Sequence, residues 1–221
     1  MALPYEERGW DPDSQPWNVP KKQEPEDDDV LVESMVPSQP IDEPAPLTIA
    51  DRILSEVVEP TEEKIRGVGI GINRSMKWAD HFERAERKNG LPRGSLISIA
   101  SIESMGDPGA GSDAGASGLM QFMPKTARWL DLRVDEEVDE RLDPVKSIEA
   151  AGKFFGDLVG GSDGDLNEAL MKYNWGSGHV SKWKSDPAKT MPMETRQYIG
   201  RWNAAMRLHG ESTGKAISSA P

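Results

Sequence analysis

The stretch LISIASIESMGDPGAGSDAGASGLMQFMP, from Leu96 to Pro124, carries most of the information in this sequence. Its first part places Leu96, Ile99, Ala100 and Glu103 at positions i, i+3, i+4 and i+7, the spacing of one helix face. Glu103 is therefore expected on the apolar face of a helix over 94–105, near its C-terminal end. Burial and the negative end of the helix dipole both raise the pKa of a carboxyl group, as general acid catalysis requires. On spacing alone, the alternative is a half-buried glutamate that pairs with a base.

A loop of small residues follows this helix. Between Gly106 and Gly118 nearly every residue is Gly, Ala, Ser, Asp or Pro. Small residues let a backbone approach a ligand closely, although the same composition is typical of a plain surface loop. Apolar residues then return, with one amide side chain, Gln121, expected to be buried, and with Pro124 at a helix start.

Helical spacing continues through the body of the chain, without sustained strand-like alternation. Helices are predicted over 75–88, 94–105, 124–131, 144–159, 165–174 and 194–208. The fold class is therefore mainly α. The glycines in Gly-Val-Gly-Ile-Gly, at 67–71, do not complete a nucleotide-binding fingerprint, and we interpret this segment as a flexible hinge.

The N-terminal part of the chain is predicted to be a disordered acidic arm over 1–46. It holds nine of the 17 prolines and the run EPEDDD at 24–29, so it cannot bury enough apolar surface to offset its conformational entropy. Within 47–58, LTIADRILSEVV, helical spacing returns, which predicts a short helix docked either on a partner or on its own domain. This helix and a linker make up 47–63. The catalytic domain is predicted over 64–208, with a flexible tail at 209–221.

The charge of the chain is unevenly distributed. The formal net charge is -12, and residues 1–63 hold 17 acidic and 4 basic side chains, a net of -13. The body is thus nearly neutral. Because an acidic arm is repelled by phosphate groups, nucleic acid is not expected as a partner.

Several classes of protein are disfavoured by composition. The absence of cysteine excludes disulfides and thiol chemistry. His81, His179 and His209 lack the spacing of metal ligands, so neither a metal site nor a cofactor is predicted. No stretch approaches the roughly 18–20 apolar residues of a membrane helix. The first residues, MALPYEERGW, lack the basic and apolar regions of a signal peptide.

Four motifs, in this order, resemble those of lytic transglycosylases with a lysozyme-like fold. The family pattern is Glu-Ser, a Ser nine residues after the Glu, and G-A-x-G-L-M-Q ending eighteen residues after it, and all three spacings match. A-L-x-x-Y-N-x-G and E-T-R-x-Y follow. The matching residues are Glu103-Ser104, Ser112, Gly115–Gln121 with Met123-Pro124, Ala169-Leu170 with Tyr173-Asn174 and Gly176, and Glu194-Thr195-Arg196 with Tyr198. Asp143-Pro144 matches the start of the intervening helix, and the resemblance covers about 76–206.

The resemblance implies a goose-type lysozyme-like (SLT) helical domain that acts on peptidoglycan glycan strands. Such enzymes cut the β-1,4 bond between N-acetylmuramic acid and N-acetylglucosamine without water and leave a 1,6-anhydro end. Glu103 is then the catalytic acid and afterwards the base, and Ser112 hydrogen-bonds near it. The residues implied to hold or orient the sugars are Ser112, Met120, Gln121, Tyr173, Asn174, Glu194 and Tyr198. For Glu194 and Arg196 the alternative is a structural role at a helix end.

The sequence departs from the family pattern at two places. Gly106 stands three residues after the Glu, where the family often has an aromatic residue. The usual Y-N-A-G-P-G is Y-N-W-G-S-G here, so that Trp175 either stacks on a sugar or fills a gap. Trp183 is also expected near the groove, whereas Trp129 and Trp202 are expected in the helical core.

Two rival functions remain open at this point. A lysozyme-type hydrolase, such as an endolysin, needs a second carboxylate or a positioned water, and Asp107 and Asp113 are the nearest acids. A catalytically idle wall-binding or structural module is disfavoured by the intact Glu103.

Delivery to the wall raises a separate question. A cell-wall enzyme without a signal peptide fits a tailed-phage virion protein that reaches the periplasm or cell wall during genome ejection. It also fits a lysis enzyme or part of a secretion machine. The long acidic arm favours docking to virion or secretion-machine proteins over a free lysis enzyme.

Overall fold

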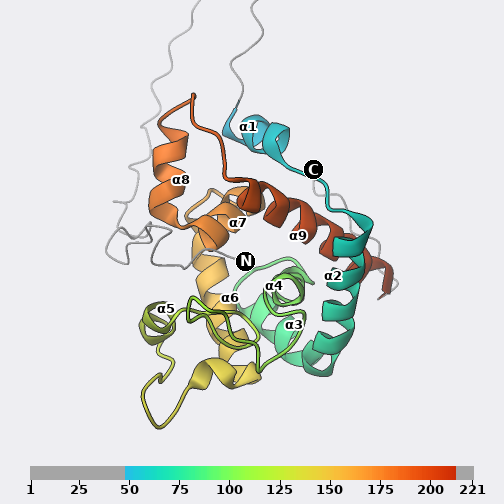
Figure 1. The fold of residues 1–221 in the computed structure, drawn as a ribbon, viewed down its shortest axis with the longest axis vertical. Helices are drawn as coiled ribbons and strands as arrows, with labels where there is room; N and C mark the ends of the chain where they lie inside the picture. The colour runs from blue at the N-terminus through green and yellow to red at the C-terminus, as the bar shows by residue number, and fades with distance from the viewer. Residues whose placement is uncertain (1–47, 213–221) are drawn as a thin grey trace, which may run out of the picture.

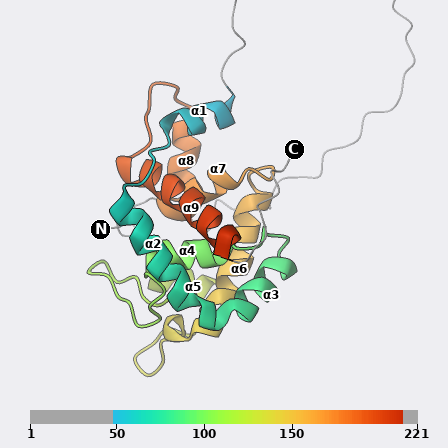
Figure 2. The ribbon, with the colours of Figure 1, turned by 90° about the vertical axis from the view of Figure 1, so that its right-hand side faces the viewer.

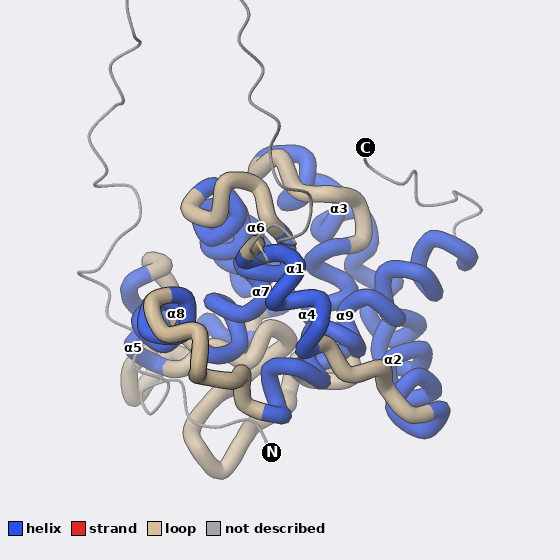
Figure 3. The backbone as a smooth tube through the Cα atoms, turned by 90° about the horizontal axis from the view of Figure 1, so that it is seen from above, coloured by secondary structure: helices blue, strands red, loops and turns tan. Residues whose placement is uncertain are grey.

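The computed structural model describes residues 48–212, and the regular elements of that part of the chain are helices (Figure 3). The predicted mainly α class is therefore confirmed. In chain order the elements are α1 (Ile49–Glu56), α2 (Glu62–Ser75), η2 (Met76–Trp78), α3 (Ala79–Lys88), α4 (Ser95–Glu103), α5 (Pro124–Trp129), η3 (Glu140–Leu142), α6 (Pro144–Gly160), α7 (Leu166–Trp175), α8 (Ser177–Lys184) and α9 (Met193–Ser212). The predicted arm over 1–46 lies outside the described residues, as do residues 213–221 of the predicted tail over 209–221, and the division into domains stays a prediction.

Helix α4 lies at the centre, with α2, α3, α6 and α9 packed around it (Figures 1 and 2). Every residue from Ser95 to Ser101 is buried. The sequence SLISIAS permits this because each side of the helix carries an apolar or small side chain. The predicted helix over 94–105 is thus present, but it is buried on all sides and not on one face alone.

The N-terminal end of α4 is capped by a buried carboxyl group. Glu86, from α3, is 2% exposed, and its two oxygens accept the amides of Gly94 and Leu96 at 2.9 Å each. Burial raises the pKa of Glu86 from 4.5 to about 7, against the opposing effect of the two amides. The side chain therefore satisfies helix amides that would otherwise lack partners in the core.

The glycine-rich segment at 67–71 lies within helix α2, so the interpretation as a flexible hinge is wrong. Gly71 is where α2 crosses α4. A Cβ atom at this position would lie 2.7 Å from Cα of Ser101. The glycine therefore permits a close approach of the two helices. Glycine-rich sequences occur both at such helix contacts and in flexible linkers, so the sequence alone does not distinguish them.

Helix α1 packs on its own domain, next to α8 and the start of α9 (Figure 1). Ile53 is completely buried in the common core, whereas its neighbour Leu54 is 57% exposed. Thr48 and Asp51 form a capping box at the start of the helix. Of the two docking modes that the sequence left open, these contacts favour the intramolecular one.

Helices α8 and α9 also depart from the predicted helices. Helix α8 was not among the predicted helices; it buries Val180 and Trp183 and begins directly after Gly176, whose φ of 93° requires glycine. Helix α9 continues to Ser212, past the predicted end at 208, because His209 and Gly210 are buried. In the part of the chain that the structure describes, no helix is both long and apolar enough to span a membrane.

Candidate active site

Glu103 is the last residue of α4 and lies half-buried at the C-terminal end of this central helix. Its Oε1 accepts a hydrogen bond of 2.9 Å from the hydroxyl of Tyr198, which α9 contributes. Tyr198 is 1% exposed. The fold thus brings the acid of the first motif to the tyrosine of the fourth, 95 residues later in the chain.

Tyr198 acts in this pair as the donor. Its burial, and secondly the negative charge of Glu103, raise the pKa of the phenol well above its usual value of 10. The hydroxyl therefore stays protonated at any pH at which the protein works. A buried, protonated phenol fixes the orientation of the Glu103 carboxyl group without competing with it for a proton.

The chain turns sharply after Glu103. The hydroxyl of Ser104 lies within hydrogen-bond distance of the carbonyls of Ala100, at 3.0 Å, and Leu119, at 2.8 Å, which joins the first motif to the second. Met105 and Gly106 then adopt positive φ angles of 52° and 73°. A Cβ atom at Gly106 would lie 2.5 Å from the carbonyl oxygen of Gly71, so this backbone leaves no room for an aromatic side chain at that position.

The loop of small residues is held by hydrogen bonds of its own. Nε2 of Gln121 donates to the carbonyls of Ala110, at 3.1 Å, and Gly118, at 2.9 Å. The hydroxyl of Ser112 accepts the amide of Ala116 at 2.9 Å. Ser112 and Gln121 are thus both placed in the loop that follows Glu103. The hydrogen bond predicted between Ser112 and the neighbourhood of Glu103 stays a prediction.

Arg141 is a site residue that the sequence analysis missed. Its side chain is buried, pairs with Asp139 at 2.7 Å, and donates to the carbonyls of Gly115, at 2.7 Å, and Phe122, at 2.9 Å. Gly118 lies so close to it that a Cβ atom would meet the Arg141 carbonyl oxygen at 1.8 Å. The one available signal was an arginine just before the Asp-Pro that opens α6, and nothing in that pattern indicates burial.

Tyr173 brings the third motif to the second. Its hydroxyl donates to the carbonyl of Met120 at 3.2 Å, and its ring packs among Phe122, Phe154 and Phe155. Tyr173 also lies close enough to Tyr198 to contribute to the raised pKa of that phenol. The side chain of Met120 is buried in the core, so it is the Met120 backbone that belongs to this cluster.

Asn174 and Thr195 join the third motif to the fourth. Oδ1 of Asn174 accepts the Thr195 hydroxyl at 2.9 Å, and both residues are buried. Glu194, directly before Thr195, is half-buried in the first turn of α9, where a carboxylate is favoured by the helix dipole. All four motifs are therefore assembled around the C-terminal end of α4.

The tryptophans only partly follow the predictions. Trp202 lies in the core, as expected. Trp129 is partly exposed and packs against the core cluster. Trp183 is fully buried beneath the guanidinium of Arg52, so its ring offers no exposed face, and its expected place nearer the groove motifs stays a prediction. Trp175 is half-buried and meets His179 edge to face, with ring centroids 5.5 Å apart.

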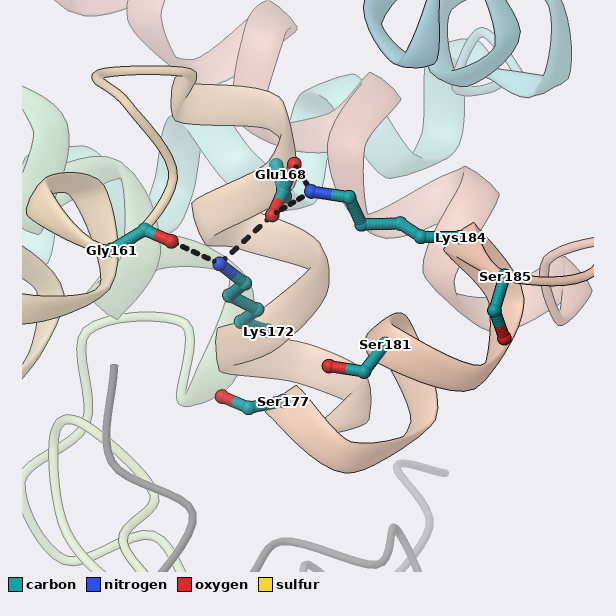
Figure 4. A pocket seen from close by; sticks show the side chains of 7 residues that line it. All are labelled: Gly161, Glu168, Lys172, Ser177, Ser181, Lys184 and Ser185. Carbon is teal, nitrogen blue, oxygen red and sulfur yellow. Dashed lines mark hydrogen bonds and ion pairs between the residues drawn. The ribbon is translucent and has the colours of Figure 1, made fainter. Parts of the chain in front are cut away.

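A polar pocket of about 530 Å³ lies between α7 and α8 and does not include Glu103 (Figure 4). Glu168 accepts hydrogen bonds from Lys184 at 2.8 and 2.9 Å and forms an ion pair of 2.8 Å with Lys172. Burial is the largest single effect on Glu168 and acts to raise its pKa, but the hydrogen bonds and charges of Lys172 and Lys184 together lower it. Lys172 also donates to the carbonyl of Gly161 at 2.7 Å. Because the carboxylate of Glu168 pairs with both lysines, we interpret these residues as a structural contact that holds α8 against α7.

Among residues 48–212 there is no cluster of three or more His, Asp or Glu side chains arranged to hold a metal ion. The groups gathered at the end of α4 include the Glu103 carboxyl, the hydroxyls of Tyr173 and Tyr198, and side-chain amides. This set is suited to proton transfer by one carboxyl group and to hydrogen bonding of a polar ligand.

A family model described as "Transglycosylase SLT domain" matches residues 80–194. The chain is 42% identical over 100 residues to the peptidoglycan transglycosylase gp16 of Escherichia phage T7, a match over 45% of this chain and 8% of the relative. It is 30% identical over 120 residues to the transglycosylase of Enterobacteria phage PRD1, over 53% of this chain and 43% of the relative. The chain thus spans less than half of either relative.

The fold has counterparts among solved structures. One is the 70 kDa soluble lytic transglycosylase SLT70 of Escherichia coli, with a TM-score of 0.54 and 25% sequence identity. That match covers 62% of this chain and 24% of the other. The lysozyme-like helical architecture expected from the sequence is therefore confirmed.

Proposed function

Because the chain belongs to the SLT transglycosylase family, we propose that it is a peptidoglycan lytic transglycosylase. Its substrate is the glycan strand, in which it cleaves the β-1,4 bond between N-acetylmuramic acid and N-acetylglucosamine. The observation that carries the proposal is the position of Glu103, a half-buried carboxyl group at the end of the central helix with one oxygen held by a buried, protonated tyrosine.

One carboxyl group suffices for the proposed reaction. Protonated Glu103 gives its proton to the glycosidic oxygen as the bond from that oxygen to C1 breaks, and the acetamido group of the sugar stabilises the cationic centre. The ionised Glu103 then takes the proton of the 6-hydroxyl group while O6 forms a bond to C1. The products are a free 4-hydroxyl group and a 1,6-anhydro end, and the enzyme regains its proton.

The other site residues take supporting roles in this proposal. Tyr198 orients the Glu103 carboxyl, and Ser112 shapes the adjoining loop. Gln121 uses both Nε2 hydrogens within that loop, so its carbonyl oxygen is the atom that faces the sugars. The remaining sugar-binding groups are Tyr173, Asn174, Glu194 and the backbone of Met120.

The hydrolase alternative lacks an obvious second carboxylate. Asp107 and Asp113 are both exposed in the small-residue loop, and Asp107 accepts the amide of Gly109 at 2.9 Å as a turn residue does. Product analysis decides between the two functions. Mass spectrometry of muropeptides released from purified sacculi should find 1,6-anhydro ends, whereas a preponderance of reducing ends would establish hydrolysis.

Replacing the acid tests the assignment of Glu103. Glu103→Gln keeps an oxygen for the Tyr198 hydroxyl but cannot transfer a proton, so we expect a folded protein with about two to four decades less cleavage. Asp107→Asn is the matched control and should cleave as the parent does. Equal cleavage by Glu103→Gln and the parent would overturn the assignment of Glu103, whereas a parent protein that cleaves no glycan would favour an idle wall-binding module.

We also propose that the N-terminal segments and the catalytic domain have separate roles. The predicted arm over 1–46 docks to virion proteins, the predicted segment over 47–63 connects it, and the enzyme reaches the periplasm or cell wall at genome ejection. The phage relatives and the arm's acidic composition support this role. Proteomics of purified particles and of infected-cell lysate tests it, because a lysis enzyme would be found only in the lysate.

A further inference from the structure

Arg52 of α1 binds the chain segment that leads from α8 into the fourth motif. Its Nη1 donates to the carbonyl of Trp183 at 3.0 Å, and its Nη2 donates to the carbonyls of Asp186, at 3.0 Å, and Lys189. The guanidinium also lies 3.8 Å from the centre of the Trp183 ring. One side chain thus binds the last turn of α8 and two points along the connection from α8 to α9.

Glu56, one turn further along α1, binds the start of α9. Its carboxylate accepts the Met191 amide at 2.7 Å and pairs with Arg196 at 3.0 Å. The backbone amide of Val58 donates to the Arg196 carbonyl at 3.3 Å. Close contact continues at Gly200, where a Cβ atom would lie 2.0 Å from the Val58 carbonyl oxygen.

The residues that α1 contacts are close in sequence to the tyrosine that binds the proposed acid, Glu103. Arg196 stands two residues before Tyr198, whose hydroxyl binds Glu103. Helix α1 itself lies outside residues 80–194, the part of the chain that matches the family model. An element outside the family domain therefore fixes the first turn of the helix that orients the acid.

We propose that Arg52 and Glu56 are positioning residues for the Tyr198–Glu103 pair. They act through the connection between α8 and α9 and through the first turn of α9. This inference rests on the proposed role of Glu103. Without α1, the Met191 amide loses its acceptor and Arg196 loses its ion pair. The start of α9 then keeps the bond from Arg196 Nε to the Met191 carbonyl, at 3.0 Å, and the bond between Thr195 and Asn174, at 2.9 Å. A displacement of about 1 Å in a reacting group can cost up to about a hundredfold in rate.

The first test compares Arg52→Ala with Leu54→Ala in the full chain, acting on purified sacculi well below the melting temperature. Leu54 is the matched control because it is on the same helix and largely exposed. For Arg52→Ala we expect kcat to fall about tenfold to a hundredfold, with KM within about twofold of the parent, and Arg52→Lys should recover part of the loss. A lower Tm with unchanged kcat would overturn the proposal.

A double-mutant cycle tests the route through Tyr198. If Arg52 acts through this hydroxyl, Arg52→Ala should reduce kcat by less than about twofold when Tyr198→Phe is already present. The same fold loss in both backgrounds would refute that route.

Hydrogen exchange provides a readout that does not depend on activity. Amides over 193–200 should exchange faster in Arg52→Ala and at the parental rate in Leu54→Ala. Unchanged protection would overturn the positioning role even if the chain cleaved no glycan. An inactive parent protein with faster exchange in Arg52→Ala would instead refute the proposed function alone.

Discussion

The buried Glu86 predicts a pH dependence of stability that a single substitution should remove. Below about pH 4.5 this carboxyl is protonated in the folded and the unfolded chain. Between pH 4.5 and about 7 the unfolded chain releases the proton while the folded protein keeps it, so stability falls as pH rises. Above about pH 7 both states are ionised and the dependence ends.

The magnitude follows from the width of this window. Each pH unit within it lowers the free energy of unfolding by about 1.4 kcal/mol, so the total is about 3 kcal/mol. In Glu86→Gln the side chain does not titrate. Gln presents one oxygen and one NH₂ group to the amides of Gly94 and Leu96, so it costs some stability, but this cost is the same at every pH.

Urea unfolding followed by tryptophan fluorescence measures the effect at pH 4.5, 5.5, 6.5 and 7.5. The quantity to compare is the parent's free energy of unfolding minus that of Glu86→Gln, which should fall by about 3 kcal/mol over this range. His209, Glu83 and Arg93 line the same small cavity and are present in both proteins, so their own titration largely cancels. A difference that stays constant from pH 4.5 to 7.5 would show that folding does not raise the pKa of Glu86.

Two further predictions concern the N-terminal half of the described chain. Gly71→Ala should lower Tm by several degrees because its Cβ would meet the Ser101 backbone at 2.7 Å, whereas Gly69→Ala, with open space around it, should leave Tm unchanged or raise it slightly. A protein that starts at residue 48 should match the full chain in Tm and in cleavage of sacculi, whereas one that starts at residue 64 should lose stability, because it lacks α1 and the first two residues of α2. Equal melting of the two shortened proteins would show that α1 contributes nothing to the fold.

The sequence predicted the central helix and its acid because apolar spacing and motif spacing agreed there. Periodicity alone implied one buried face, yet α4 is buried all around, since serine and alanine side chains can line a core as readily as a surface. The hinge interpretation at 67–71 failed for a related reason. Glycine permits both flexibility and close helix packing, and only the position of Ser101 on another helix decides between them.

The supporting residues were harder to predict than the motif residues. Arg141, Arg52 and Glu56 act through backbone carbonyls and amides, or through partners distant in sequence, so no local pattern marks them. Glu103 and Tyr198 could be placed together only through family resemblance, because 95 residues separate them. Their actual contact depends on how α9 crosses α4.

The loop between Gly106 and Gly118 has a consequence for ligand binding. Its carbonyls are bound by Gln121 and Arg141, and its glycines at 115 and 118 hold positive φ angles of 92° and 81° in the folded protein. The conformational entropy of this segment is therefore lost when the protein folds and is not lost again when a ligand binds. A loop that is already ordered lowers the entropic cost of binding, and it discriminates by shape against ligands that would require the loop to rearrange.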